Sequence, residues 1–114
     1  MTRYLPTEAQ QWRTIDVVGM PMKACRLWEG DHNVKSGLFH MPQGMALPSH
    51  HHPYWCQIYV VSGTMEVQAE GEQPHIIGCG GYYFVEPGDT HRETALTDTL
   101  LLTICEEDRP EFRR

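Results

Sequence analysis

Apolar residues along this chain occur in short segments, many of them alternating with polar residues, and glycine or proline interrupts them repeatedly. The segments that read as candidate strands are 13–18, 24–28, 34–41, 45–52, 57–61, 64–69, 75–77, 82–85 and 100–105. Turn signals at intervals of about 8–12 residues are typical of β-sandwiches and β-barrels. The one helical signal is a short turn within residues 7–12, directly after Pro6. The pattern therefore predicts an all-β domain with at most a short N-terminal helical turn.

Length and charge narrow the class of protein. The 114 residues suit a single compact domain, 1–114, in which about 34–105 form the motif-bearing barrel and 106–114 form a charged tail. The formal net charge of −6 argues against binding to nucleic acid through phosphate contacts. No apolar run is long enough to cross a membrane, and the first residues lack the apolar core of a signal peptide. We therefore expect a cytoplasmic protein.

The cysteines are widely spaced and form no C-x-x-C pair, so a zinc ribbon or a thioredoxin-type motif is not supported. They are Cys25, Cys56, Cys79 and Cys105. In a reducing cytosol each is expected to be a thiol. Small buried hydrophobic residues are the expectation for all of them except Cys56, which lies close to the histidines described next.

Histidines supply the clearest candidate chemistry. His50, His51 and His52 are consecutive, and His91 lies far downstream. Side chains alternate between the two faces of a strand, so His50 and His52 share one face and His51 points the opposite way. Two imidazoles on one face chelate a metal ion when a third ligand arrives from another strand, and His91 is the candidate for that ligand. The remaining histidines are expected at the surface or within strands: His32, His40 and His75.

Glycines frame these histidines at regular distances. Gly44 is followed by five residues and then by the run 50–52, and Gly63 closes this first motif. Gly80 is followed by five residues and then by the segment 86–91, which reads Glu-Pro-Gly-Asp-Thr-His. Together the two motifs resemble the two signature motifs of the cupin superfamily, over roughly residues 34–105. The resemblance implies a double-stranded β-helix, or jelly-roll barrel, of the RmlC-like type with a metal ion at its mouth.

The chain departs from the cupin pattern at the position of a metal-binding glutamate. Counting three residues after His52 places Cys56 there, and counting four places Gln57 there. Cys56 fits the distance to Gly63 better and is the favoured candidate for a fourth ligand, although its side chain is shorter than that of glutamate. Without it, His50, His52 and His91 form a neutral three-histidine face. The resemblance implies one divalent metal ion, with Fe(II) favoured for an oxygenase and Zn(II) or Ni(II) as alternatives.

The resemblance also suggests a pocket for a small organic molecule. Alternation along the strands gives as candidate lining residues Met45, Leu47, Tyr59, Tyr83 and Thr103. Arg92, next to His91, either binds an acidic substrate or points outward. Some cupin dioxygenases use three histidines without the glutamate. A metal-dependent dioxygenase acting on a diketone or a phenolic ketone is therefore the favoured hypothesis, and no residue is assigned a catalytic role. No motif side chain is an obvious general base.

Two other classes of function stay open. One is a non-catalytic cupin that binds a metal or a ligand, as a sensor or stress-related protein, and the other is a metal-assisted isomerase or lyase. Partner predictions are a small-molecule substrate or ligand, neither nucleic acid nor membrane, and a homodimer. The homodimer is expected because small cupins commonly pair through their sheets.

Overall fold

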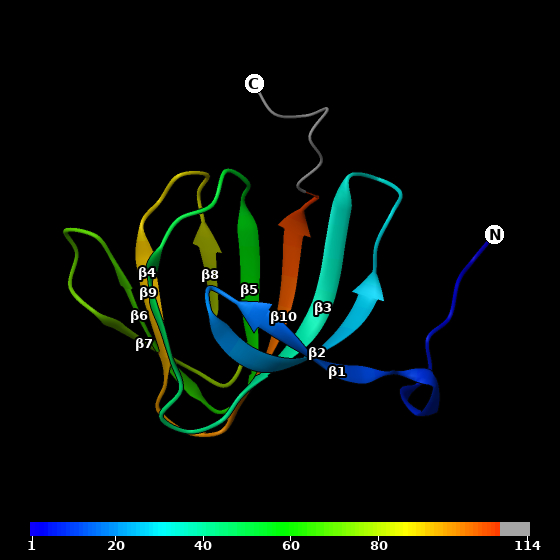
Figure 1. The fold of residues 1–114 in the computed structure, drawn as a ribbon, viewed down its shortest axis with the longest axis horizontal. Coiled ribbons are helices and arrows are strands. Elements are labelled where there is room, and N and C mark those ends of the chain that lie inside the picture. The colour runs from blue at the N-terminus through cyan, green and yellow to red at the C-terminus, as the bar shows by residue number, and fades with distance from the viewer. Residues whose placement is uncertain (108–114) are drawn as a thin grey trace.

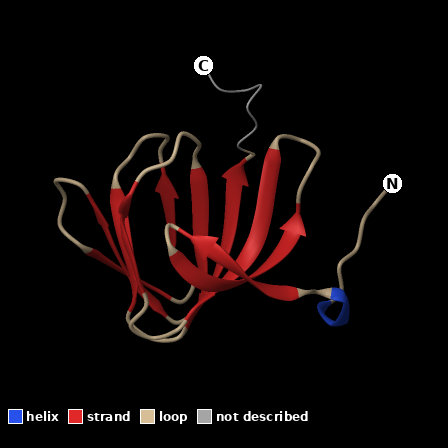
Figure 2. Ribbon diagram, in the orientation of Figure 1, coloured by secondary structure: helices blue, strands red, loops and turns tan. Residues whose placement is uncertain are grey.

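The computed structural model describes residues 1–107 and confirms the all-β prediction (Figures 1 and 2). A single 3-10 turn, η1 (Thr7–Ala9), precedes the strands. The strands are β1 (Trp12–Val17), β2 (Met20–Trp28), β3 (Val34–Met41), β4 (Ala46–His50), β5 (Cys56–Ser62), β6 (Thr64–Ala69), β7 (His75–Gly78), β8 (Tyr82–Val85), β9 (His91–Ala95) and β10 (Thr99–Glu106). None of the described residues forms a helix that is long and apolar enough to span a membrane.

The strands form two antiparallel sheets. The first has six strands in the order β1-β2-β3-β10-β5-β8, and the second has four in the order β4-β9-β6-β7 (Figure 1). The chain passes from one sheet to the other after β3, β4, β5, β7, β8 and β9. Such repeated crossing wraps the chain into the jelly-roll barrel that the sequence predicts, and it brings β4 and β9 together from distant parts of the chain.

The core lies between the inner faces of the two sheets. Strand β5 shows the expected alternation, since Cys56, Ile58 and Val60 are buried and the residues between them are not. Met41 from the six-stranded sheet and Met65 from the four-stranded sheet are fully buried in the same apolar cluster. Burial of one such aliphatic side chain stabilises the fold by about 1.5–3 kcal/mol. The sheets are therefore held together by apolar packing, and they position the ends of β4 and β9 above the core.

The turn between β5 and β6 depends on a glycine. Gly63 has φ +90°, and a Cβ placed there would lie 2.3 Å from the backbone oxygen of Asp98. No other residue fits this position without a shift of the neighbouring chain. The glycine that closes the first sequence motif is therefore required by backbone conformation and by close approach of another strand.

Several sequence predictions of strands match closely, and one strand was not predicted. The ranges 34–41, 64–69 and 82–85 are confirmed at both ends, whereas β2 starts earlier than predicted, at Met20. Strand β9 was missing from the predicted strands, apart from the expectation that His91 begins one. The predicted charged tail 106–114 lies mostly outside the described residues, and Glu106 belongs to β10.

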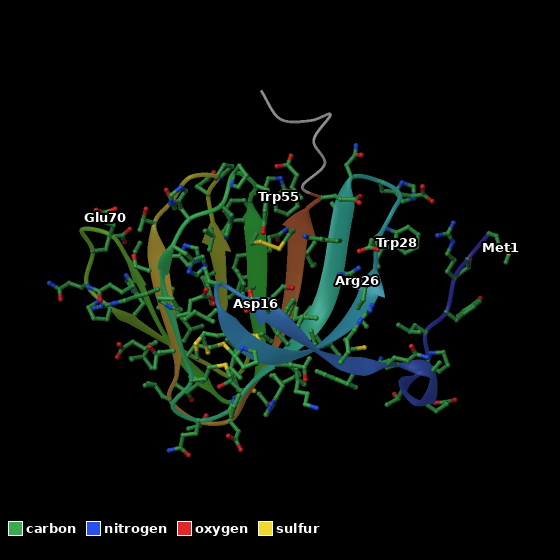
Figure 3. All side chains as sticks on the ribbon, viewed as in Figure 1. Met1, Asp16, Arg26, Trp28, Trp55 and Glu70 are labelled. Atoms are coloured by element: carbon green, nitrogen blue, oxygen red, sulfur yellow. A yellow bond between two sulfur atoms is a disulfide. The ribbon has the colours of Figure 1, made fainter. Side chains whose placement is uncertain are left out.

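The prediction that every cysteine is a thiol is wrong in this structure. Cys56 on β5 lies directly opposite Cys105 on β10, with 4.2 Å between their Cα atoms, and the two sulfurs form a disulfide (Figure 3). The prediction failed because the cysteines are distant in sequence, and only the pairing of β5 with β10 places them together. Cys25 and Cys79 are free thiols, the first buried and the second exposed.

Candidate metal centre

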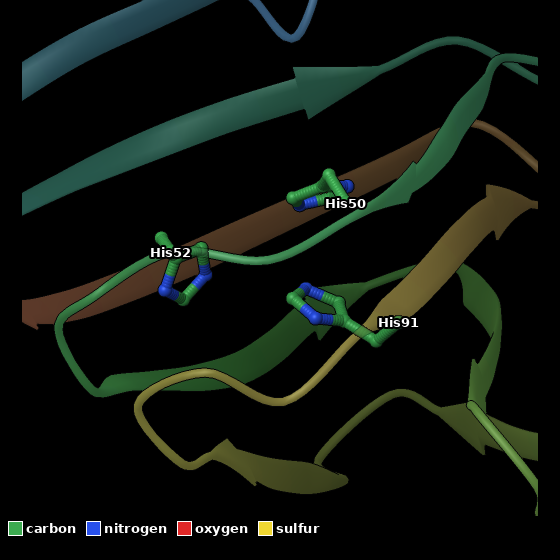
Figure 4. Close-up of side chains that lie close together, drawn as sticks. All are labelled: His50, His52 and His91. Atoms are coloured by element: carbon green, nitrogen blue, oxygen red, sulfur yellow. The ribbon is translucent and has the colours of Figure 1, made fainter.

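Three imidazoles converge where β4 ends and β9 begins (Figure 4). His50 is the last residue of β4, His91 is the first residue of β9, and the two are partners in the register of these strands. His52 lies in the loop that follows β4. One ring nitrogen from each histidine lies within 4.8 Å of the other two. The sequence prediction that His50, His52 and His91 meet is therefore matched by their positions in the structure.

Backbone carbonyls orient all three rings. The Nδ1 atoms lie 2.7 Å from the Pro48 oxygen for His50, 2.7 Å from the Tyr54 oxygen for His52, and 3.1 Å from the Asp89 oxygen for His91. A carbonyl oxygen only accepts hydrogen bonds, so in each pair Nδ1 carries the proton and donates it. A neutral imidazole then has its lone pair on Nε2, the atom left to bind a metal ion.

The ring of His52 is fixed although it lies beyond the end of a strand. It stacks on Tyr54 with 4.5 Å between ring centroids and 11° between planes. The Lys35 ammonium lies over the Tyr54 ring, 5.3 Å from its centroid. Burial lowers the pKa of His52, and the neighbouring imidazoles lower it further, although its backbone contact acts in the opposite direction. A lowered pKa favours the neutral ring that metal binding requires.

The donor set fits a divalent transition metal. Three neutral imidazole nitrogens that share one side of the ion suit Fe(II), Zn(II) or Ni(II), and they leave positions for water or a substrate. Hydrogen bonds from the second ring nitrogen to carbonyl groups are the usual outer support of metal-binding histidines. The three imidazoles are therefore oriented as the ligands of a metal ion would be.

A buried carboxylate lies beside the imidazoles. Glu93 Oε1 lies 3.3 Å from Nε2 of His91 and 3.9 Å from Nε2 of His50. The hydroxyl of Tyr83, on β8, donates a hydrogen bond to Oε2 of the same carboxylate. Glu93 is on β9, two residues after His91, so both side chains point to the same face of the strand.

Burial and pairing act against each other on these groups. Burial of Glu93 raises its pKa, but hydrogen bonds with His91 and Tyr83 outweigh burial, and the pKa lies below its ordinary value. Burial lowers the pKa of His91, but the hydrogen bond and the charge of Glu93 outweigh it, and the pKa is raised. Burial raises the pKa of the Tyr83 hydroxyl well above its ordinary value, and the Glu93 charge adds to this. Glu93 is thus an anion whose Oε1 atom faces the imidazoles.

A pocket of about 430 Å³ opens in front of the imidazoles. His50, His52 and His91 line it, and so do Leu47 and Thr103 from the predicted lining set. Arg13, Arg26 and Lys35 also line it, together with the carboxylates of Asp16 and Glu93. The site therefore combines metal-binding nitrogens, an apolar wall and cationic side chains.

Other predicted lining residues lie elsewhere. Met45 packs against the hydrophobic core, and Tyr83 is partly buried and reaches the pocket only through its bond to Glu93. The prediction for Tyr59 is wrong, because it occupies the outward face of β5 and is 43% exposed. Sequence alternation identified the strands, but it left open which face of β5 looks inward.

The two candidates for a fourth ligand on β5 are not part of the imidazole cluster. Cys56 lines the pocket, but its sulfur is bonded to Cys105, so it offers no thiolate to a metal ion. Gln57 has its side chain on the opposite face of β5, where Oε1 accepts a hydrogen bond from the Tyr82 hydroxyl. Neither side chain is placed to complete the site in this structure.

The structure also places the polar residues that neighbour the three imidazoles in sequence and the remaining histidines. His51 is exposed, as predicted, although it borders the mouth of the pocket. Arg92 points outward, and its guanidinium donates hydrogen bonds to Gln68. His32, His40 and His75 are not among the residues that line this pocket.

Sequence analysis missed Glu93. The signal that could have found it is alternation from His91, since the second residue along a strand returns to the same face. That step requires residues 91–95 to be recognised as a strand, and these residues are less apolar than the other strands.

Comparisons with known proteins identify the family and the fold. The sequence model described as "Cupin domain" matches residues 37–105. KdgF from Halomonas sp. is similar in structure, with a TM-score of 0.80 and 18% identity over 97% of this chain and 100% of that one. An RmlC-like cupin from Shewanella frigidimarina has a TM-score of 0.78 and 20% identity over 99% and 97% of the two chains. A Thermotoga maritima protein described as a predicted oxalate decarboxylase has a TM-score of 0.78 and 15% identity over 92% and 99%. The comparison with curated proteins found no significant match.

Proposed function

Because the chain belongs to the cupin family, with the domain matched over residues 37–105, we propose that it is a metal-dependent enzyme acting on a small oxygen-bearing organic molecule. The observation that carries this proposal is the orientation of the three imidazoles. Each Nδ1 is held by a backbone carbonyl, which leaves the three Nε2 atoms directed at a pocket large enough for a small molecule. A purely structural histidine cluster has no need of such a pocket.

The reaction class that we favour is a dioxygenase reaction on a diketone or a phenolic ketone, with Fe(II) as the metal ion. When bound, such an ion would supply Lewis-acid chemistry to the oxygen atoms of the substrate. His50, His52 and His91 would hold the ion, and Leu47 and Thr103 would help to enclose the substrate. Positioning of this kind is a large part of catalysis when the ion and the substrate carry the chemistry.

The pocket offers cationic side chains to an anionic form of the substrate. Arg13, Arg26 and Lys35 line it, although Arg26 is ion-paired with Glu29 and the carboxylates of Asp16 and Glu93 belong to the same lining. The enolate of a diketone, a phenolate or a carboxylate would gain from these cations and would bind a metal ion more strongly than the neutral molecule. The cationic side chains thus support a substrate that carries negative charge on oxygen.

A second candidate is a metal-assisted isomerase or lyase, and one observation favours it. Glu93 and Tyr83 form a hydrogen-bonded pair next to the imidazoles, and a carboxylate in that position is able to accept a proton from a bound substrate. The sequence motifs contained no evident base, whereas the folded site contains this one. The role of Glu93 therefore separates the two candidates.

The test is a measurement of metal content followed by activity. The purified protein is analysed for bound metal and then supplied with diketones, phenolic ketones and small carboxylic acids, with O₂ uptake and product mass recorded. Consumption of O₂ with incorporation of oxygen into the product supports a dioxygenase. Turnover that proceeds equally well without O₂ supports the isomerase or lyase, and a metal-loaded protein that binds these compounds without turnover supports a non-catalytic cupin.

The expected homodimer and the cytoplasmic location remain predictions. Light scattering of the purified protein distinguishes a monomer of 13.1 kDa from a dimer of twice that mass. Cell fractionation tests the cytoplasmic location. The Cys56–Cys105 disulfide bears on this prediction, because disulfides are rare in reducing compartments such as the cytoplasm.

A further inference from the structure

The carboxylate of Glu93 lies beside two of the nitrogen atoms that would bind a metal ion. Its carboxylate is buried, and Oε1 lies 3.3 Å from Nε2 of His91 and 3.9 Å from Nε2 of His50. Removing a carboxylate from water is costly unless a positive charge or several hydrogen bonds compensate. The buried carboxylate of Glu93 therefore needs a positively charged or hydrogen-bonding partner on the side that faces the imidazoles.

The hydrogen bonds around Glu93 define where that partner lies. Tyr83 donates to Oε2, so Oε1 is the oxygen that faces the imidazoles. His50 and His91 use Nδ1 as the donor to the carbonyls of Pro48 and Asp89, so Nε2 is the ring nitrogen that each of them presents beside Oε1. A proton on Nε2 of His91 is one positive partner for the carboxylate, and a metal ion bound by both Nε2 atoms is another, which displaces that proton.

One of the two distances is that of ligands on one ion. Ligand atoms about 2.1 Å from a metal lie about 3.0 Å apart at right angles and about 3.4 Å apart at the tetrahedral angle. The separation of 3.3 Å from His91 falls in this range, and that of 3.9 Å from His50 slightly exceeds it. The atoms that all lie within 4.8 Å of one another belong to the three histidines and do not include Glu93, so its carboxylate has to shift toward the ion to bind it.

We propose that Glu93 is the fourth protein ligand of the metal ion and that Tyr83 is the positioning residue that holds its second oxygen. The carboxylate would then come from β9, two residues after His91, and replace the glutamate that the first motif lacks at Cys56. This inference rests on the proposed metal site. A Glu93 carboxylate bound to the ion would lower the net charge of the site by one. It would also no longer be available to accept a proton from the substrate, which favours the dioxygenase over the isomerase or lyase.

The test compares metal binding of Glu93→Gln with that of Glu66→Gln. Glu66, on the neighbouring strand β6, does not line the pocket and serves as the matched control. Each protein is stripped with a chelator and titrated with Co(II), whose visible absorption reports its ligands, and Zn(II) affinity is measured by competition with a chromophoric chelator. We expect Glu93→Gln to weaken Zn(II) binding about 10- to 100-fold and to change the Co(II) spectrum, and Glu66→Gln to do neither.

Two further measurements make the outcome decisive. Tyr83→Phe keeps the carboxylate, so we expect the Co(II) spectrum to retain its form while Zn(II) affinity falls by less than about 10-fold. In wild-type protein labelled with ¹³C at glutamate carboxyl carbons, Zn(II) should shift one buried resonance, which requires no variant to fold. An unchanged Co(II) spectrum and affinity in Glu93→Gln, or no shifted carboxyl resonance, overturns the proposal. Full metal content in His52→Ala would instead overturn the metal site itself.

Discussion

His50 and His91 are partners in register between β4 and β9, and their ring centroids lie 4.4 Å apart. One residue ends its strand and the other begins its strand, so the pairing of the two strands fixes both backbones. His52 is outside the strands and depends on its contact with Tyr54 instead. The site is therefore built from two ligands that the sheet positions and one that a loop positions.

Removal of any of the three histidines should abolish tight metal binding. His50→Ala, His52→Ala and His91→Ala each delete one nitrogen of the cluster, and we expect metal affinity to fall by more than about 100-fold, because loss of even an outer partner costs 10- to 100-fold. Elemental analysis after dialysis measures the occupancy. His51→Ala is the matched control, because that side chain is exposed beside the same ligands, and its metal content should equal that of the wild type.

A metal ion bound at this site should stabilise the fold, since the unfolded chain does not hold the three nitrogens together. At a free concentration 100 times the Kd, the gain is about 2.7 kcal/mol. Thermal unfolding with and without Zn(II) measures it. The increase in Tm should disappear in His52→Ala, and an equal increase in that variant would show that the ion acts at another place.

The sequence was sufficient for the fold and for the three imidazoles, and insufficient for their surroundings. His50, His52 and His91 could be found because alternation and two glycine-framed motifs depend on local spacing alone. The pairing of Cys56 with Cys105 depends on which strands become neighbours across a separation of 49 residues, and no local pattern contains that information. Glu93 was missed for a simpler reason, because the polar strand that carries it has too little apolar alternation to be recognised.

Loss of the disulfide should destabilise the protein without removing the metal. In the chain-entropy account, a crosslink across 49 residues stabilises the native state by up to about 4 kcal/mol. The double substitution Cys56→Ser, Cys105→Ser should lower the free energy of unfolding by up to that amount in urea titrations. Metal content should stay unchanged, and its loss would restore Cys56 as a candidate ligand. Cys79→Ser, which alters a free and exposed cysteine, is the control.

Gly63 should tolerate no side chain. Alanine there would need φ near +90° and would place its Cβ 2.3 Å from the Asp98 oxygen, so the turn between β5 and β6 must move. We expect Gly63→Ala to reduce the free energy of unfolding by about 2–4 kcal/mol, the sum of backbone strain and overpacking. Gly78→Ala is the comparison, because a Cβ at Gly78 meets nothing within 4 Å, and it should cost less than about 1 kcal/mol. Equal losses in the two variants would contradict the role given to the Gly63 conformation.

The hydroxyl of Tyr83 should matter for stability far more than that of its neighbour Tyr82. Tyr83 donates to the buried carboxylate of Glu93, whereas Tyr82 donates to Gln57 on an exposed face. Tyr83→Phe leaves one oxygen of a buried anion without a donor, which costs about 1–3 kcal/mol, and Tyr82→Phe should cost less than about 0.5 kcal/mol, because water replaces the lost partner. Urea unfolding of the two metal-stripped variants measures the difference. If Tyr83→Phe unfolds at the same urea concentration as Tyr82→Phe, then the Tyr83 hydroxyl does not hold Glu93 in place, and the carboxylate must be fixed by the imidazoles alone.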